Sequence, residues 1–76
     1  MKLQVIGSNQ TLVQIHNQEY FFSYDTCVAG RDDSGDYWKV DHKYSNTTSR
    51  HVNSYLNGQT PELVSVSDVE LVMNHL

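Results

Sequence analysis

The sequence is poor in several residue types, and each shortage excludes a class of protein. Cys27 is the only cysteine, so the chain can form neither an internal disulfide nor a zinc site built from cysteines, and a lone reduced thiol suits the cytoplasm. Five Lys and Arg face nine Asp and Glu, and the net charge of −4 argues against a nucleic-acid binder that depends on a basic surface. No apolar run approaches the length of a membrane span, and the N-terminal segment is too short and interrupted for a secretion signal. We therefore expect a cytoplasmic protein without membrane contact and without a cofactor.

The chain does contain enough apolar surface for one small domain over residues 1–76. Hydrophobic residues make up 38% and aromatic residues 11% of the sequence, which is too much for a disordered chain. Domains of this size bury only about 60% of their unfolded surface, so stability is marginal. It must come from dense aromatic packing or from burial against a second copy, and homodimerisation therefore stays open.

The first half of the sequence alternates between apolar and polar residues, the pattern of antiparallel strands. Alternation is short at residues 3–5 and 13–15, is strongest at residues 19–29, and returns at residues 37–44 after a turn at residues 30–36. These segments predict a four-stranded antiparallel meander with one buried face and one partly wet face. Its rings are expected in the core rather than on a base-stacking platform; they are Tyr20, Phe22, Tyr24 and Trp38.

From position 45 the spacing of apolar residues changes from two to about 3.6, which indicates a helix. Ser45 or Asn46 can cap its start, and Gly58 supplies a left-handed end. One stripe of this helix should pack on the sheet; its members are Thr48, Val52, Tyr55 and Leu56.

The C-terminal third favours two more elements. Residues 62–66 fit a short fifth strand at the sheet edge. Ser67 and Glu70 form a capping box, which predicts that a short terminal helix begins there. Its apolar stripe consists of Val69, Val72, Met73 and Leu76. The predicted fold is thus α+β, with a meander, one central helix and a short C-terminal helix.

The opposite stripe of the central helix is the main candidate for a binding surface. A merely solvated helix face usually carries Glu and Lys, whereas this one is almost uncharged apart from Arg50. Amides, hydroxyls and one guanidinium can pair with a partner at little cost in desolvated charge. The competing interpretation of this stripe is an ordinary solvated helix face. For His51 the competing interpretation is a structural role, in which its ring stacks on Tyr55. The candidate residues are Asn46, Ser49, Arg50, His51, Asn53 and Asn57.

An acidic turn is a weaker candidate. Asp32, Asp33 and Asp36 could imitate the phosphates of a nucleic acid, but aspartates favour solvated turns in any case.

Enzymatic and metal-dependent functions have little support. Cys27 alternates inside a strand-like segment, so we interpret it as a structural thiol rather than a nucleophile. The four histidines lack the spacing of a ligand set, and no metal site is predicted; they are His16, His42, His51 and His75.

Two segments resemble small proteins of unknown function encoded by tailed bacteriophages. One is an aromatic strand that ends in Ser-Tyr-x-Thr-x-Val-Ala, from Ser23 to Ala29. The other, at residues 45–53, follows Ser-x-Thr-Thr-x-Lys/Arg-His-x-Asn. Arg50 stands where similar chains often have Lys, and Tyr44 stands where Trp is common.

The resemblance implies a phage origin and an intracellular site of action, but no particular activity. We therefore expect a non-enzymatic accessory protein that binds a host or phage macromolecule stoichiometrically, such as an inhibitor of host defence machinery. A protein is the expected partner. The alternatives are a nucleic-acid binder that uses the helix face at residues 46–57 and a small metal- or thiol-dependent enzyme.

Overall fold

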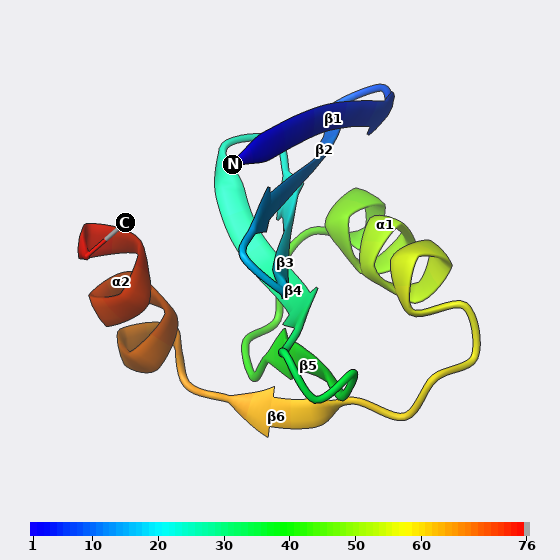
Figure 1. Ribbon diagram of the computed structural model, residues 1–76. Helices are drawn as coiled ribbons and strands as arrows, with labels where there is room; N and C mark the ends of the chain where they lie inside the picture. Colours follow the sequence, from blue (N-terminus) through cyan, green and yellow to red (C-terminus); the bar gives the residue numbers. More distant parts are fainter. Residues whose placement is uncertain (76) are drawn as a thin grey trace.

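Six strands form one sheet in the order of the chain, and a helix lies on each side of it (Figure 1). The first five strands are an antiparallel meander, and the sixth pairs with the fifth in parallel. The computed structural model describes residues 1–75, with the elements β1 Lys2–Gly7, β2 Gln10–Ile15, β3 Gln18–Ser23, β4 Thr26–Arg31, β5 Tyr37–Val40, α1 Asn46–Leu56, β6 Glu62–Val64 and α2 Val66–Asn74. The predicted α+β class is confirmed, but the sheet is larger than the predicted four- or five-stranded one.

The predicted long strand at residues 19–29 is wrong, because the chain turns back in its middle. Tyr24 adopts a positive φ of 55°, and its amide donates to the carbonyl of Asn9 at 2.8 Å. Tyr24 and Asp25 thus form a tight turn between β3 and β4. Asp25 is a common turn residue, but the positive φ falls on a tyrosine and no glycine follows, so the usual Asn-Gly or Asp-Gly signal is absent from this turn. Tyr24 is half exposed and is not the core residue that was expected.

A bulge in β4 changes which of its side chains face the first helix. Phe21 pairs with Ala29 and Phe22 with Cys27, so Val28 is an extra residue in β4. Val28 and Ala29 both enter the core on the α1 side, while Cys27 enters the core on the α2 side. Simple alternation fails where an extra residue is inserted.

A helix packs on each face of the sheet, so the face that was predicted to be partly wet also contains a core. On one side α1 buries Val52 and Leu56 against Phe21, Val28 and Ala29. On the other side α2 places Val69 in a second core, formed with Tyr20, Cys27 and Val40. Phe22 and Trp38 border this second core, as expected of rings that pack inside. Two small cores thus replace a single larger one.

Several element boundaries in the second half of the chain differ from the predicted ones. β5 ends at Val40 rather than at residue 44, and β6 ends at Val64. Ser65 caps α2 by accepting a hydrogen bond from the amide of Asp68 at 3.1 Å, so the capping box predicted at Ser67 is wrong. Ser65 precedes the helix in an extended conformation, which the cap requires. The predicted apolar position Leu76 lies outside the described residues. No helix within residues 1–75 is long and apolar enough to cross a membrane.

Of the two glycines in the sheet, Gly30 has the less room for a side chain. A Cβ added there would overlap the ring of Trp38 and the carbonyl oxygen of Glu19. We therefore expect Gly30→Ala to lower the free energy of unfolding by about 1–3 kcal/mol, measured by urea denaturation. Gly7→Ala is the matched control, because there the close atom is the movable end of the Gln10 side chain. Equal effects of the two changes would contradict this account.

Candidate functional site

The central helix α1 is fixed at both ends by local hydrogen bonds. Ser45 Oγ accepts from the amide of Thr48 at 3.2 Å, which selects Ser45 over Asn46 as the cap. At the other end Asn57 and Gly58 both have a positive φ, and the amide of Gln59 returns to the carbonyl of Leu56 at 2.9 Å. The predicted start and left-handed end of the helix are confirmed, and its rotation on the sheet is set by its side chains.

Polar residues on the inner face attach the first half of α1 to β3. Ser23 Oγ lies 3.0 Å from Thr48 Oγ1 and 2.8 Å from His51 Nδ1. The ring of His51 also packs beside Tyr24, at 6.0 Å between centroids. His51 therefore serves the junction between helix and sheet, in contact with Ser23 and Tyr24 instead of the predicted stack on Tyr55.

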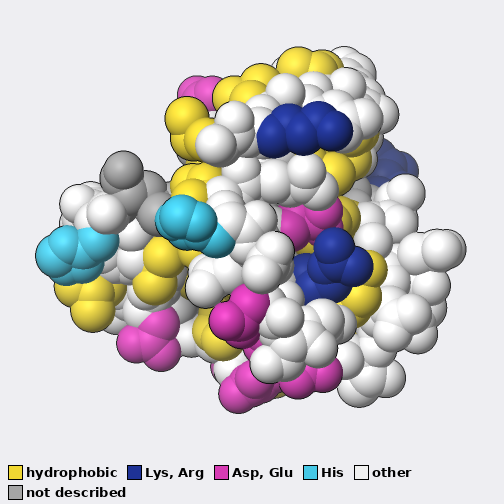
Figure 2. All heavy atoms as spheres, in the orientation of Figure 1, with side chains coloured by type: hydrophobic (Ala, Val, Ile, Leu, Met, Phe, Trp, Pro, Cys, Tyr) yellow, Lys and Arg dark blue, Asp and Glu magenta, His cyan; other side chains and the backbone are white. Residues whose placement is uncertain are grey.

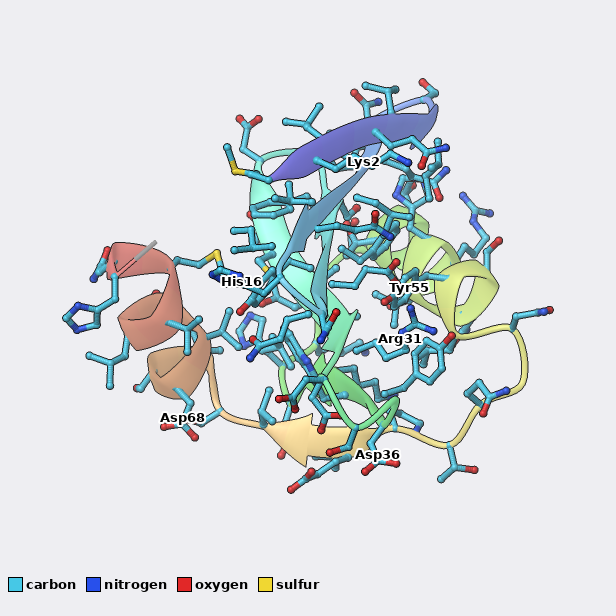
Figure 3. The ribbon with its side chains drawn as sticks, in the orientation of Figure 1. Lys2, His16, Arg31, Asp36, Tyr55 and Asp68 are labelled. Atoms are coloured by element: carbon cyan, nitrogen blue, oxygen red, sulfur yellow. The ribbon has the colours of Figure 1, made fainter. Side chains whose placement is uncertain are left out.

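Tyr55 attaches the second half of α1 to the same strand. Its ring stacks on Phe21 at 4.6 Å between centroids, and its hydroxyl donates to Glu19 Oε2 at 2.6 Å. Gln14 Nε2 donates to the other carboxylate oxygen at 3.1 Å, so the buried Glu19 has a donor on each side. Burial first, and then the carboxylate of Glu19, raise the pKa of Tyr55 well above its ordinary value. Figure 3 places Arg31 and Tyr55 together on this side of the sheet.

The outer face of α1 is free of these contacts and lies in solvent. We use this name for five predicted residues, all exposed, as is Ser54 on the same helix; they are Asn46, Ser49, Arg50, Asn53 and the C-cap Asn57. Within residues 1–75 the guanidinium of Arg50 makes one hydrogen bond, a long contact of 3.5 Å to Thr47 Oγ1. Its donors are therefore directed at solvent and can reach a partner. Of the six residues predicted for this surface, His51 is turned inward and the other five share one exposed face.

The outer face of α1 adjoins a polar hollow that sequence reasoning missed. The hollow has a volume of about 250 Å³ and lies between α1 and the segment after β5. Ser49 and Asn53 line it together with Lys39 and Lys43, while Asp41 supplies one negative charge. The sequence scatters its basic residues, and only the fold brings two lysines beside the helix. Together with Arg50, they give this side of an acidic protein a locally positive character.

The acidic turn lies apart from α1, and the side chain of Asp32 forms hydrogen bonds within the turn itself. Asp32 Oδ1 accepts from the amides of Ser34 and Asp36, each at 3.0 Å, and Gly35 closes the turn with a φ of 90°. Asp32 and Asp33 border a hollow with the turn between β2 and β3, not with α1. The interpretation as a solvated turn therefore has a structural basis, and the structure does not join this turn to the outer face of α1.

The two side chains considered as nucleophiles, Ser23 and Cys27, are buried. Ser23 and His51 have the spacing of a nucleophile and its base, yet Ser23 is only 2% exposed. Cys27 is 6% exposed and its thiol donates to the carbonyl of Ala29. Within residues 1–75, no three His, Cys, Asp or Glu side chains are grouped as a metal site would require.

Comparison with known proteins gives one family. Its sequence pattern matches residues 1–70, which extend from β1 into α2 and include all of α1. The chain belongs to DUF8033, a family of unknown function. No curated protein and no solved structure matches it. The part of the chain shared with DUF8033 contains the whole sheet and the outer face of α1, so both are features to test as properties of the family.

The contact between Tyr55 and Glu19 yields a stability prediction. Tyr55→Phe keeps the stack on Phe21 but removes a donor from a buried carboxylate, so we expect a loss of about 1–3 kcal/mol in the free energy of unfolding. Urea denaturation measures the loss. Tyr24→Phe removes a hydroxyl from a half-exposed ring and should change stability little. A Tyr55→Phe variant as stable as Tyr24→Phe would show that the hydrogen bond contributes nothing.

Cys27 yields a prediction for alkaline pH. Burial raises the pKa of its thiol from 9.0 to about 12. The unfolded chain therefore loses this proton at a lower pH than the folded protein does. The thiol's contribution is fully present below pH 9, and the free energy of unfolding should fall as the pH rises from 9 toward 12. Cys27→Ala should reduce this slope, and an unchanged slope would contradict the assignment.

Proposed function

We propose that this protein is a non-enzymatic binding protein that acts by stoichiometric contact with a protein partner through the outer face of α1. The observation that carries the proposal is the exposed, nearly uncharged stripe of amides and hydroxyls around Arg50, whose exposed guanidinium makes one long hydrogen bond, to Thr47. Such groups pair with backbone carbonyls and carboxylates, and an arginine can make two parallel hydrogen bonds to one carboxylate.

The inner and outer faces of α1 have separate roles, which supports this proposal. The helix is attached to the sheet by Thr48, His51 and Tyr55 on its inner side. The outer residues make no part of that attachment, so a partner can contact them without disturbing the fold. The neighbouring Lys39 and Lys43 favour a partner segment that carries carboxylates. The burial of Ser23 and Cys27 supports binding rather than catalysis.

A phage setting belongs to the same proposal. The segments at residues 23–29 and 45–53 resemble small proteins of tailed bacteriophages. The second segment supplies the cap, the inner attachment and Arg50 of the proposed surface. In that setting the protein would work in the host cytoplasm, and occupation of a host defence protein would explain a role without catalysis.

A second candidate function is nucleic-acid binding by the same side of the molecule. Lys39 and Lys43 beside Ser49 and Asn53 favour it, since cations and amides contact phosphates and bases. The net charge of −4 opposes it. Salt separates the two functions, because affinity for phosphates falls steeply with added salt. Binding of a labelled 20-nucleotide single strand that weakens by more than about tenfold between 50 and 200 mM salt would favour nucleic acid.

Arg50→Ala tests the protein-binding proposal. The tagged protein is used to capture partners from bacterial host lysate, the captured protein is identified and purified, and binding is measured by calorimetry. We expect a fixed stoichiometry for the natural sequence and a loss of more than about 1 kcal/mol in binding free energy for Arg50→Ala. The side chain of Arg50 is exposed, so thermal unfolding should be unchanged.

Lys2→Ala is the control, because it also removes one exposed cation but lies on β1 and not on the helix. It should bind the partner as the natural sequence does. If Arg50→Ala keeps full affinity, or if both variants lose it equally, the outer face of α1 is not the contact surface.

A further inference from the structure

The two edges of the sheet are built very differently. One edge is β6, which has three residues and follows Pro61 directly. Short edge strands and prolines are ways in which proteins prevent unwanted pairing. The other edge is β1, with six residues and no proline, and within the described chain no strand lies beyond it. Its outward backbone groups are therefore open to another strand.

The side chains of β1 make this edge apolar on one face. Leu3 pairs with Val13, and Val5 pairs with Thr11, so both side chains point to the α2 side of the sheet. Leu3 is 64% exposed and Val5 70% exposed, because α2 does not extend over them. Met1 is also exposed. Figure 2 agrees, since hydrophobic side chains reach the surface at the end of this view where β1 lies, while most visible acidic side chains lie toward the opposite end.

We propose that β1 pairs antiparallel with β1 of a second copy, which joins two six-stranded sheets into one continuous sheet. A two-fold axis at Gln4 places Leu3 of each copy opposite Val5 of the other, and Gln4 opposite Gln4. The pleats of the two strands then match, because the side chains that face α2 in one copy lie beside those that face α2 in the other copy. The strand is thus complementary to itself, with Leu3 and Val5 in an apolar row on one face and Lys2, Gln4 and Ile6 on the other.

The charges of β1 also fit a second copy. The chain as a whole is acidic, yet β1 contains no carboxylate and its one charged side chain is Lys2. In the proposed pairing the two Lys2 residues lie opposite Ile6, at the two ends of the ribbon. They are about 13 Å apart along the strands, which exceeds the screening length of about 8 Å in physiological salt. Nothing in the strand therefore opposes the pairing of like molecules.

The size of the contact sets its expected strength. Stable dimers bury about 800 Å² on each partner, and one six-residue edge strand with its exposed side chains provides less than that. The dimer should accordingly be reversible, with a dissociation constant of about 1–10 μM. The proposal does not depend on the role of α1, which lies on the other face of the sheet.

Light scattering after size exclusion tests the dimer. At 100 μM the natural sequence should have twice the 8.7 kDa mass of the chain. Val5→Lys should be a monomer, because a lysine in this row blocks edge pairing. Leu71→Lys is the matched control, since Leu71 is a similarly exposed apolar residue on α2, and it should remain a dimer. Circular dichroism checks that each variant is folded.

A cysteine at the proposed two-fold axis tests the register directly. In an antiparallel pair, residues directly opposite have Cα atoms about 4.5–5.5 Å apart, within the range of a disulfide. Gln4→Cys should form a covalent dimer when diamide accepts the electrons of the two thiols. Ser67→Cys, on the exposed start of α2, should not. The native Cys27 is buried and does not compete.

The outcomes decide the proposal. A dimer that Val5→Lys abolishes and Leu71→Lys retains, with selective crosslinking of Gln4→Cys, supports it. A monomer at 100 μM overturns it, and so does a dimer that survives Val5→Lys. If Val5→Lys fails to fold, the crosslink decides alone: equal crosslinking of the two cysteine variants, or of neither, overturns the proposed edge.

Discussion

The attachment of α1 to β3 is the contact on which the arrangement of the molecule depends. Three alternate residues of β3 point to the same side of the sheet, and each contacts α1. Glu19 accepts from Tyr55, Phe21 stacks on the same ring, and Ser23 bonds to Thr48. Because Tyr55 is near the end of the helix and Thr48 near its start, the helix must run opposite to the strand. Its direction and rotation are therefore both fixed.

This attachment decides which residues of α1 are left for a partner. Most side chains of this 11-residue helix are polar, and Thr48, His51 and Tyr55 on the inner side are used for hydrogen bonds to the sheet. Rotation about the axis would bury Arg50 and expose Tyr55, at the cost of a buried carboxylate without its donor. The candidate binding surface therefore follows from the hydrogen bonds that the inner side chains of α1 make to β3, because these bonds determine which residues face outward.

The small size of the domain explains its surfaces. A 76-residue chain that covers both faces of a sheet needs two cores, and neither helix is long enough to cover every strand. α2 buries Val69 but leaves Leu71 and Val72 largely exposed, and it does not reach the side chains of Leu3 and Val5. An open edge with exposed apolar residues follows from this shortage of covering structure. Assembly with another strand is the physical remedy for such an edge.

The sequence by itself determined the class of the fold, the central helix from its cap to its left-handed end, and the stripe that this helix exposes, because these depend on local periodicity and local hydrogen bonds. It did not indicate the turn at Tyr24, where a tyrosine rather than a glycine or asparagine takes the positive φ and its amide bonds to Asn9. It also did not indicate the bulge at Val28, the second covered face, the inward position of His51 or the lysines beside α1. Tertiary structure decided these features, because they depend on how strands pair and how elements pack rather than on local periodicity.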